Sequence, residues 1–344
     1  MNFKLLTKKA EVVIKYCMGI KPGEDFLILV DGTLGENLTR AFSAAAATLR
    51  AETQVLTYNP PDYLPMREFS FFAGASLTPC DAEPPSTVSA AIKEADANIF
   101  LTSDMRILFS QALREALRRH RRIIFLPYIT EENFVRLLPS STEEVNNLRG
   151  MVEKGTEIFE RSQSARITSR VGTDIRMDLG EYRVIPHLGV AEAGSIQILP
   201  GGQVTLVPNE DSAEGVLVID RSIAAPEYKE LRYPITLKIS SGMVSEIDGN
   251  YEAQALKRFL VELEDPNMYH VTELSIGTNP RCRFAGIAAP AEDTHTLGSV
   301  NMALGCDVHI GGSIRAKAHI DMTMRWATLL LDDRIVVEDG ILRI

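Results

Sequence analysis

The sequence predicts a doubly wound parallel α/β domain over residues 1–164, followed by a mainly antiparallel β-rich domain over residues 165–344. Before residue 164, continuous apolar runs alternate with amphipathic segments, which is typical of parallel strands covered by helices on both faces. After it, most segments alternate apolar and polar residues and end at Gly or Asp turns, which is typical of antiparallel strands. A chain of 344 residues is long enough to build a core in each domain.

The first half of the chain reads as strands and helices in alternation. The expected helices are residues 8–20, 35–50, 86–96, 109–120 and 142–163, and the expected strands are residues 26–30, 53–58, 97–102 and 121–127. The segment "DGTLGEN" after the first strand lacks the Gly-x-Gly-x-x-Gly spacing, and its carboxylates Asp31 and Glu36 would repel a phosphate. A plain turn from strand to helix is therefore expected there.

The second half reads as strands interrupted by one helix. The expected strands lie within residues 165–180, 202–208, 214–220, 235–249, 271–276, 307–314, 318–333 and 334–344, and the expected helix is residues 251–265. Because Gly and Asp mark most of the turns, these strands are expected to pair in antiparallel hairpins.

Bulk composition excludes several classes of partner. The net charge of -10 argues against a general nucleic-acid or anionic-membrane surface, and no stretch reaches membrane-spanning length. The four cysteines (Cys17, Cys80, Cys282 and Cys306) have neither zinc-knuckle nor disulfide-framework spacing. We therefore expect a cytoplasmic protein that acts on a small molecule.

The stretch "KAHIDMTMRW" carries the first candidate site. In a strand, His319 and Asp321 project from one face, while Ile320, Met322, Met324 and Trp326 form an apolar face on the other. This polar face could meet a metal, a substrate or water, and a structural polar pair on an edge strand is the alternative. Glu273, in "VTELSIG", is a half-buried carboxylate that requires either a metal or a salt bridge with an arginine.

Four motifs together resemble a known superfamily. The segments "ELSIGTNP", "GSVNMALG" and "GG" followed by "HIDM", with "LPGGQVTLVPNEDSAEGVLVID" before them, are similar in order and spacing to the aminopeptidase T and aminopeptidase S metallopeptidases. The resemblance covers most of the β-rich domain. It implies that Glu273, His319 and Asp321 are metal ligands, and that the chain forms a homo-oligomer as the peptidases do.

The chain departs from the peptidase pattern at two metal-binding positions. Gly201–Val204 stands where the peptidases carry a metal-binding glutamate, and Asn301 replaces a metal-binding histidine. A two-metal hydrolytic centre needs such shared ligands. One divalent ion is therefore expected, either Fe, Mn or Zn, with His295 or His309 as possible replacement ligands.

A second branch of the superfamily is also similar. "NEDSAEGVLVID", "HIDM" and "LLLDDRIVV" resemble the 2,5-dihydroxypyridine 5,6-dioxygenases, which hold one Fe(II) with two histidines and an aspartate. Glu273 stands at the position of the first of those histidines. Residues 101–111 also lack a histidine that the branch carries in its active site.

The surviving ligands Glu273, His319 and Asp321 match the peptidase pattern better, which favours a metal-dependent hydrolase of a small, anionic, amide or peptide-like substrate. Glu210 or Glu214 would then act as general base. We expect Arg315, Lys317 and His309 to bind the substrate, and the alternative for Arg315 and Lys317 is that they are solvated charges on an edge strand. A mononuclear non-haem Fe(II) ring-cleaving dioxygenase is the first alternative, and a metal-free binding protein is the second.

Overall fold

The structure is a computed structural model that describes residues 2–31, 35–59, 83–102, 104, 107–108, 110–127, 129–226, 229–284 and 290–344. Within these residues, contacts divide the chain into two units. The first comprises residues 2–59, 83–150 and 187–201, and the second comprises residues 151–186 and 202–344. The sequence predicts a single boundary at residue 164, whereas the contacts assign the later segment 187–201 to the first unit. The "DGTLGEN" turn lies largely outside the described residues.

The first unit is built on a parallel sheet of five strands in the order β2-β1-β3-β4-β8. The strands are β1 (Asp25–Asp31), β2 (Glu52–Tyr58), β3 (Ala97–Leu101), β4 (Arg122–Phe125) and β8 (Ile196–Ile198). Every residue of the inner strand β3 is buried, and all but Asn98 are apolar, as expected for a strand covered on both faces. β8 was not predicted. It is only three residues long and reaches this sheet from a distant part of the chain.

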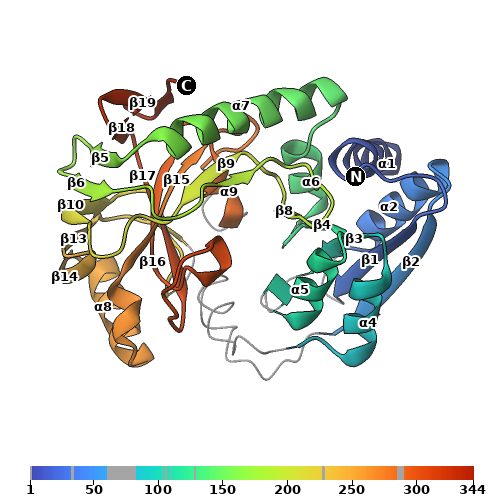
Figure 1. The fold of residues 1–344 in the computed structure, drawn as a ribbon, viewed down its shortest axis with the longest axis horizontal. Helices are drawn as coiled ribbons and strands as arrows, with labels where there is room; N and C mark the ends of the chain where they lie inside the picture. Colours follow the sequence, from blue (N-terminus) through green and yellow to red (C-terminus); the bar gives the residue numbers. More distant parts are fainter. Residues whose placement is uncertain are drawn as a thin grey trace. The chain divides into compact units, whose positions relative to one another are not determined.

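Helices cover both faces of this sheet (Figure 1). They are α1 (Phe3–Val12), which continues as a π-helical turn (Val13–Cys17), α2 (Glu36–Thr48), α4 (Ser86–Glu94), α5 (Gln111–Arg118) and α6 (Glu131–Leu137). Helices α1, α2 and α6 pack together, and α4 packs on α5. The chain moves in one direction along the sheet from β1 through α2 to β2, and in the opposite direction from β2 through α4 to β3. Right-handed crossovers therefore place the two groups of helices on opposite faces. The predicted doubly wound fold is confirmed.

The second unit contains two antiparallel sheets, which confirms the predicted β-rich class. The eight-stranded sheet has the order β14-β13-β10-β6-β5-β18-β19-β20, and the seven-stranded sheet has the order β12-β11-β17-β16-β15-β9-β7. The first contains β5 (Ser164–Thr168), β6 (Asp174–Asp178), β10 (Glu214–Ile219), β13 (Ile235–Ser240), β14 (Met243–Gly249), β18 (Thr328–Leu331), β19 (Arg334–Glu338) and β20 (Ile341–Leu342). The second contains β7 (Ile185–His187), β9 (Gln203–Leu206), β11 (Ser222–Ile223), β12 (Lys229–Glu230), β15 (Val271–Gly277), β16 (Val300–Gly305) and β17 (His319–Met324).

Among the described residues, three α-helices accompany these sheets. Helix α7 (Thr142–Arg161) runs from the first unit into the second, and α8 (Tyr251–Leu263) packs on β13 and β14. The short α9 (Pro290–His295) packs on β15 and β17. No helix among the described residues combines the length and the hydropathy needed to cross a bilayer.

Residues 307–314, expected as a strand, form a turn instead. Val308–Ile310 is a 3₁₀ turn that ends at Gly311, whose φ of +89° favours glycine. The Asp307 carboxylate accepts a hydrogen bond from the backbone N–H of Ile314 at 2.7 Å. An aspartate side chain thus supplies the acceptor that a neighbouring strand would otherwise provide.

Candidate metal site

One face of the seven-stranded sheet is polar and buried. Cross-strand partners share a face of the sheet, so the strand registers align polar side chains across neighbouring strands. One such row consists of Thr205 on β9, Ser275 on β15, Asn301 on β16, Thr323 on β17 and Ser222 on β11. All are at most 1% exposed, so this face does not meet bulk water. The opposite face is apolar, and β17 packs there against β10 of the other sheet.

The neighbouring row of this face holds two carboxylates with an alanine between them. Ala303 on β16 is the cross-strand partner of Glu273 on β15 and of Asp321 on β17. His319 lies two residues before Asp321 and pairs with Gly305. Because β16 contributes only a methyl group and a glycine at these positions, it leaves space above the strand toward which the three polar side chains can converge.

Glu273, His319 and Asp321 do converge. His319 Nε2 lies 3.3 Å from Glu273 Oε2 and 3.3 Å from Asp321 Oδ1. One ligand atom from each residue lies within 4.8 Å of the others, and all three side chains are buried. Two carboxylate oxygens and an imidazole nitrogen fit a divalent ion of the Mn, Fe or Zn type and leave coordination positions for other ligands.

The ring of His319 is held in the orientation that metal binding requires. Its Nδ1–H donates a hydrogen bond to the carbonyl oxygen of Cys306, with Nδ1 and the oxygen 2.7 Å apart. This bond directs Nε2 toward the carboxylates. Burial alone would lower the pKa of His319, but the charges of Asp321 and Glu273 outweigh it and raise that pKa well above its ordinary value. A proton and a metal ion therefore compete for the same nitrogen.

Amide side chains stand beside the ligand group. Gln203 Nε2 donates to Ser275 Oγ at 2.9 Å and to Glu273 Oε1 at 3.4 Å. Asn301 Nδ2 donates to the backbone carbonyl of Thr294 at 3.0 Å. In the segment 201–204 and at position 301, where the peptidase pattern has metal ligands, the chain thus has hydrogen-bond donors. Within the described residues, Glu273, His319 and Asp321 form the sole group of three or more His, Cys, Asp or Glu side chains that could hold a metal ion.

His309 and His295 lie outside the converging group. The exposed His309 ring meets the ring of His319 edge to face, with centroids 4.6 Å apart. His295 is buried in α9, and its Nδ1 lies 3.2 Å from Thr294 Oγ1. His309, one of the predicted substrate-binding residues, thus contacts a candidate metal ligand.

Asp307 is a buried acid near this site that the sequence analysis missed. Burial raises its pKa to about 6, although the Ile314 N–H and the charge of His319 favour the ionised form. A Cβ on Gly312 would collide with its carboxyl group, so a glycine is required opposite it. The adjacent "GG" of residues 311–312 was the available signal, but the segment was expected to be a strand.

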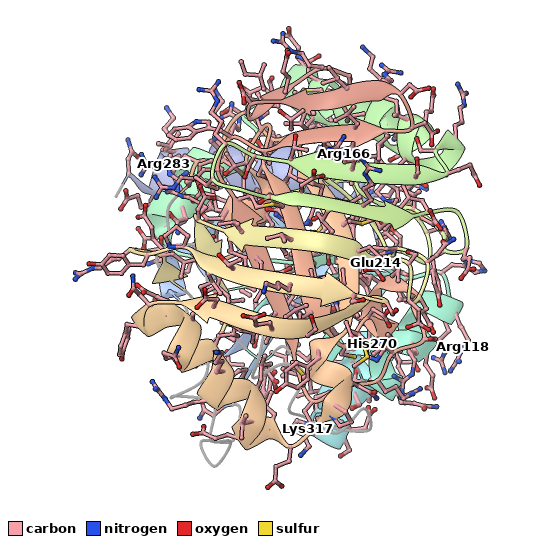
Figure 2. The ribbon with its side chains drawn as sticks, turned by 90° about the vertical axis from the view of Figure 1, so that its left-hand side faces the viewer. Arg118, Arg166, Glu214, His270, Arg283 and Lys317 are labelled. Atoms are coloured by element: carbon pink, nitrogen blue, oxygen red, sulfur yellow. The ribbon has the colours of Figure 1, made fainter. Side chains whose placement is uncertain are left out.

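Glu210 and Glu214, the predicted general bases, have structural partners. Tyr182 donates to Glu210 Oε1 at 2.6 Å and Ser313 donates to the same oxygen, which together lower the pKa of Glu210. Glu214 lies on β10 of the eight-stranded sheet (Figure 2) and accepts a 2.6 Å hydrogen bond from the backbone N–H of Ser241. The metal ligands belong to the other sheet.

Two of the predicted substrate-binding residues, Arg315 and Lys317, precede strand β17 and do not follow the alternation of its side chains between the two faces of the sheet. β17 begins at His319, so the face on which it lies does not extend back to Arg315 and Lys317. Lys317 Nζ donates to the carbonyl oxygen of Leu263 at 2.6 Å, at the end of α8 (Figure 2). Arg315 is exposed.

The far end of the ligand strand also differs from the sequence prediction. β17 ends at Met324, and Trp326, expected in the apolar face, is 66% exposed. The alternative of an edge strand is likewise wrong, because β17 lies between β11 and β16.

Comparison with known proteins identifies relatives along the whole chain. The family described as NicX: 2,5-dihydroxypyridine 5,6-dioxygenase matches residues 6–344. A 2,5-dihydroxypyridine 5,6-dioxygenase of Pseudomonas putida is 28% identical over 260 residues, which cover 73% of each chain.

Two solved structures share the fold. The 2,5-dihydroxypyridine dioxygenase from Pseudomonas putida KT2440 has a TM-score of 0.84 at 24% identity, covering 100% of this chain and 98% of its own. AmpT from Thermus thermophilus has a TM-score of 0.73 at 14% identity, covering 99% of each chain. The predicted superfamily, including its dioxygenase branch, is confirmed.

The prediction of a hydrolase is wrong. The family that matches the chain is described as a dioxygenase, which was the first alternative. Hydrolysis was ranked first because Glu273 matches the peptidase pattern, but the identity of one ligand does not determine which reaction a metal site supports. The general-base role of Glu210 and Glu214 belonged to the hydrolytic reaction and is withdrawn with it.

Proposed function

Because the chain belongs to the 2,5-dihydroxypyridine 5,6-dioxygenase (NicX) family, we propose that it is a mononuclear non-haem iron dioxygenase that opens a hydroxylated aromatic ring. Glu273, His319 and Asp321 are the proposed metal ligands. The observation that carries the proposal is the match over residues 6–344 to a dioxygenase family, in a chain whose described residues gather a buried group of three donors.

The chemistry of the donor set suits this function. Three protein ligands would leave coordination positions for a chelating substrate and for dioxygen, as in non-haem iron sites with two imidazoles and one carboxylate. Bound Fe(II) would supply the one-electron dioxygen chemistry that protein side chains lack. Here the carboxylate of Glu273 replaces one imidazole, so the ligand set carries one more negative charge.

The side chains have separate tasks in this proposal. The carbonyl oxygen of Cys306 holds His319 with Nε2 toward Glu273 and Asp321, the residues that would hold the ion with it. The buried polar face of the sheet keeps bulk water away from the reacting groups, which strengthens electrostatic interactions within the site. The exposed ring of His309, in contact with His319, is the proposed substrate-binding group.

The substrate is proposed at the level of a class. The Pseudomonas putida relative is named for 2,5-dihydroxypyridine, a hydroxylated nitrogen heterocycle that can carry negative charge as a phenolate. This chain has Glu273 at a position expected for histidine and no histidine in residues 101–111. We therefore propose a hydroxylated aromatic or heteroaromatic ring, with 2,5-dihydroxypyridine as the first compound to test.

The test uses protein purified without oxygen and loaded with Fe(II). Dioxygen uptake and loss of the aromatic absorbance are measured with 2,5-dihydroxypyridine and with a panel of related dihydroxylated rings. With ¹⁸O₂, both labelled atoms are expected in the ring-opened product, and the His319→Ala and Asp321→Ala variants are expected to be inactive. Label incorporated from H₂¹⁸O alone, or full activity in both variants, would contradict the proposal.

A further inference from the structure

The contact between Gln203 and Glu273 points to a role for an amide in defining the metal site. Glu273 has two carboxylate oxygens that face different partners. Oε2 lies 3.3 Å from His319 Nε2, within the ligand group, whereas Oε1 accepts from Gln203 Nε2 at 3.4 Å. The two oxygens are thus distinguished by the protein.

The amide of Gln203 is itself held in place. Its Nε2 donates to Ser275 Oγ at 2.9 Å, the shorter of its two contacts, and its side chain is only 6% exposed. The backbone of Gln203 pairs with Gly277, which presents no side chain on the shared face. The glutamine can therefore lie along β15 toward Ser275 and Glu273.

We infer that Gln203 is a positioning residue that makes Glu273 a ligand of one atom. A carboxylate can bind a metal through one oxygen or through both, whereas an imidazole offers a single nitrogen. With Oε1 occupied by an amide N–H, Glu273 offers Oε2 alone, as a histidine at this position would offer one atom. The coordination position that a second oxygen would fill stays open for water or substrate.

This inference rests on the proposed metal site, and it goes beyond the proposed function because it explains how a glutamate can serve at that position. The same hydrogen bond also places an N–H donor beside the more negative ligand set. Partners of metal ligands commonly change metal affinity by about 10- to 100-fold when they are removed.

The test compares Gln203→Leu in two backgrounds, wild type and Glu273→His, with Mn(II) affinity measured by calorimetry. Leucine removes the donor at similar volume. We expect affinity to fall by about 10-fold in the wild-type background and by less than about 3-fold in the Glu273→His background, where no second oxygen exists. Equal losses in both backgrounds, or no loss in the wild type, would overturn the inference.

A second readout applies even if Glu273→His does not bind metal. In Gln203→Leu, Glu273 is free to bind through both oxygens and to displace a metal-bound water, so the water-proton relaxivity of the Mn(II) protein should fall. Unchanged relaxivity would overturn the inference.

The matched control is Thr205→Val. Thr205 lies on the same strand and the same buried face, two residues from Gln203, and valine keeps its shape. Mn(II) affinity and relaxivity should match the wild type. An equal loss in this control would show that packing of β9, and not the amide, sets the affinity.

A different result is expected if Glu273, His319 and Asp321 do not form a metal site. His319→Ala would then bind Mn(II) as tightly as the wild type. If His319→Ala abolishes binding while Gln203→Leu has no effect, the metal site stands and the role of Gln203 does not.

Discussion

Glu273 and Asp321 lie on strands that do not pair with each other, yet both are cross-strand partners of the same residue, Ala303. Adjacent strands are about 4.8 Å apart, so side chains on the two outer strands of three must lean toward each other to share an ion. The small side chain on the middle strand permits this. A single methyl group therefore determines whether the two carboxylates can meet at His319.

Enlarging Ala303 should weaken metal binding while the fold persists. In Ala303→Val, two additional methyl groups enter the space between the carboxylates, at a cost of about 1–3 kcal/mol in unfolding free energy for overpacking. We expect at least a 10-fold loss of Fe(II) or Mn(II) affinity, measured by calorimetry and elemental analysis. Ala303→Ser, which is small and polar, serves as control and should retain the metal. Wild-type affinity in the valine variant would refute this account.

Metal affinity should rise with pH. The pKa of His319 is raised in the metal-free protein by Asp321 and Glu273 despite its burial, so the ring must lose a proton before Nε2 can bind a metal. Below that pKa, the apparent affinity is expected to increase about 10-fold per pH unit. Calorimetry in two buffers of different ionisation enthalpy should report the release of about one proton per ion. Identical dissociation constants at pH 6 and pH 8 would argue against His319 as a ligand.

Asp307 should make the metal-free protein less stable as pH rises. Its folded pKa of about 6 lies above its ordinary value of 3.8, so the folded state holds the proton more tightly than the unfolded state. The resulting stabilisation is fully present below about pH 4 and is lost as pH rises through about 6. At about 1.4 kcal/mol per pKa unit, its size is at most about 3 kcal/mol.

The control for this effect is Asp307→Asn, which keeps an acceptor for the Ile314 N–H but cannot ionise. Urea unfolding at pH 4 and pH 7 gives the free energy for both proteins. The difference in unfolding free energy between wild type and variant reports the titration of Asp307 alone, because both proteins retain His319. A difference that does not change with pH would show that Asp307 titrates normally.

Periodicity predicted most of the elements because each strand and helix buries one side or both. The continuous apolar run of β1 and the alternation of β17 were each visible in a few residues. The short β8 and the turn at 307–314 were not, because their conformations depend on distant partners: β8 pairs with β4, and Asp307 caps Ile314.

The candidate site was only partly visible in the sequence. Spacing alone placed His319 and Asp321 on one face, but their proximity to Glu273 depends on the register of β15, β16 and β17. A slip of one residue in β15 would move Glu273 to the apolar face. The resemblance to known families, and not the spacing, brought Glu273 into the predicted ligand set. The contact of Gln203 with it could not be read from either source.

Lys317 offers a test that separates a structural role from substrate binding. Its ammonium group donates to the carbonyl oxygen of Leu263, the last residue of α8, where a positive charge also interacts favourably with the helix dipole. Lys317→Ala should therefore lower the free energy of unfolding by about 0.5–1 kcal/mol and leave KM unchanged. Urea unfolding and oxygen-uptake kinetics with the ring substrate measure the two quantities. A raised KM with unchanged stability would instead assign Lys317 to the substrate, and Arg315→Ala, the neighbouring exposed cation, provides the comparison for a general loss of positive charge.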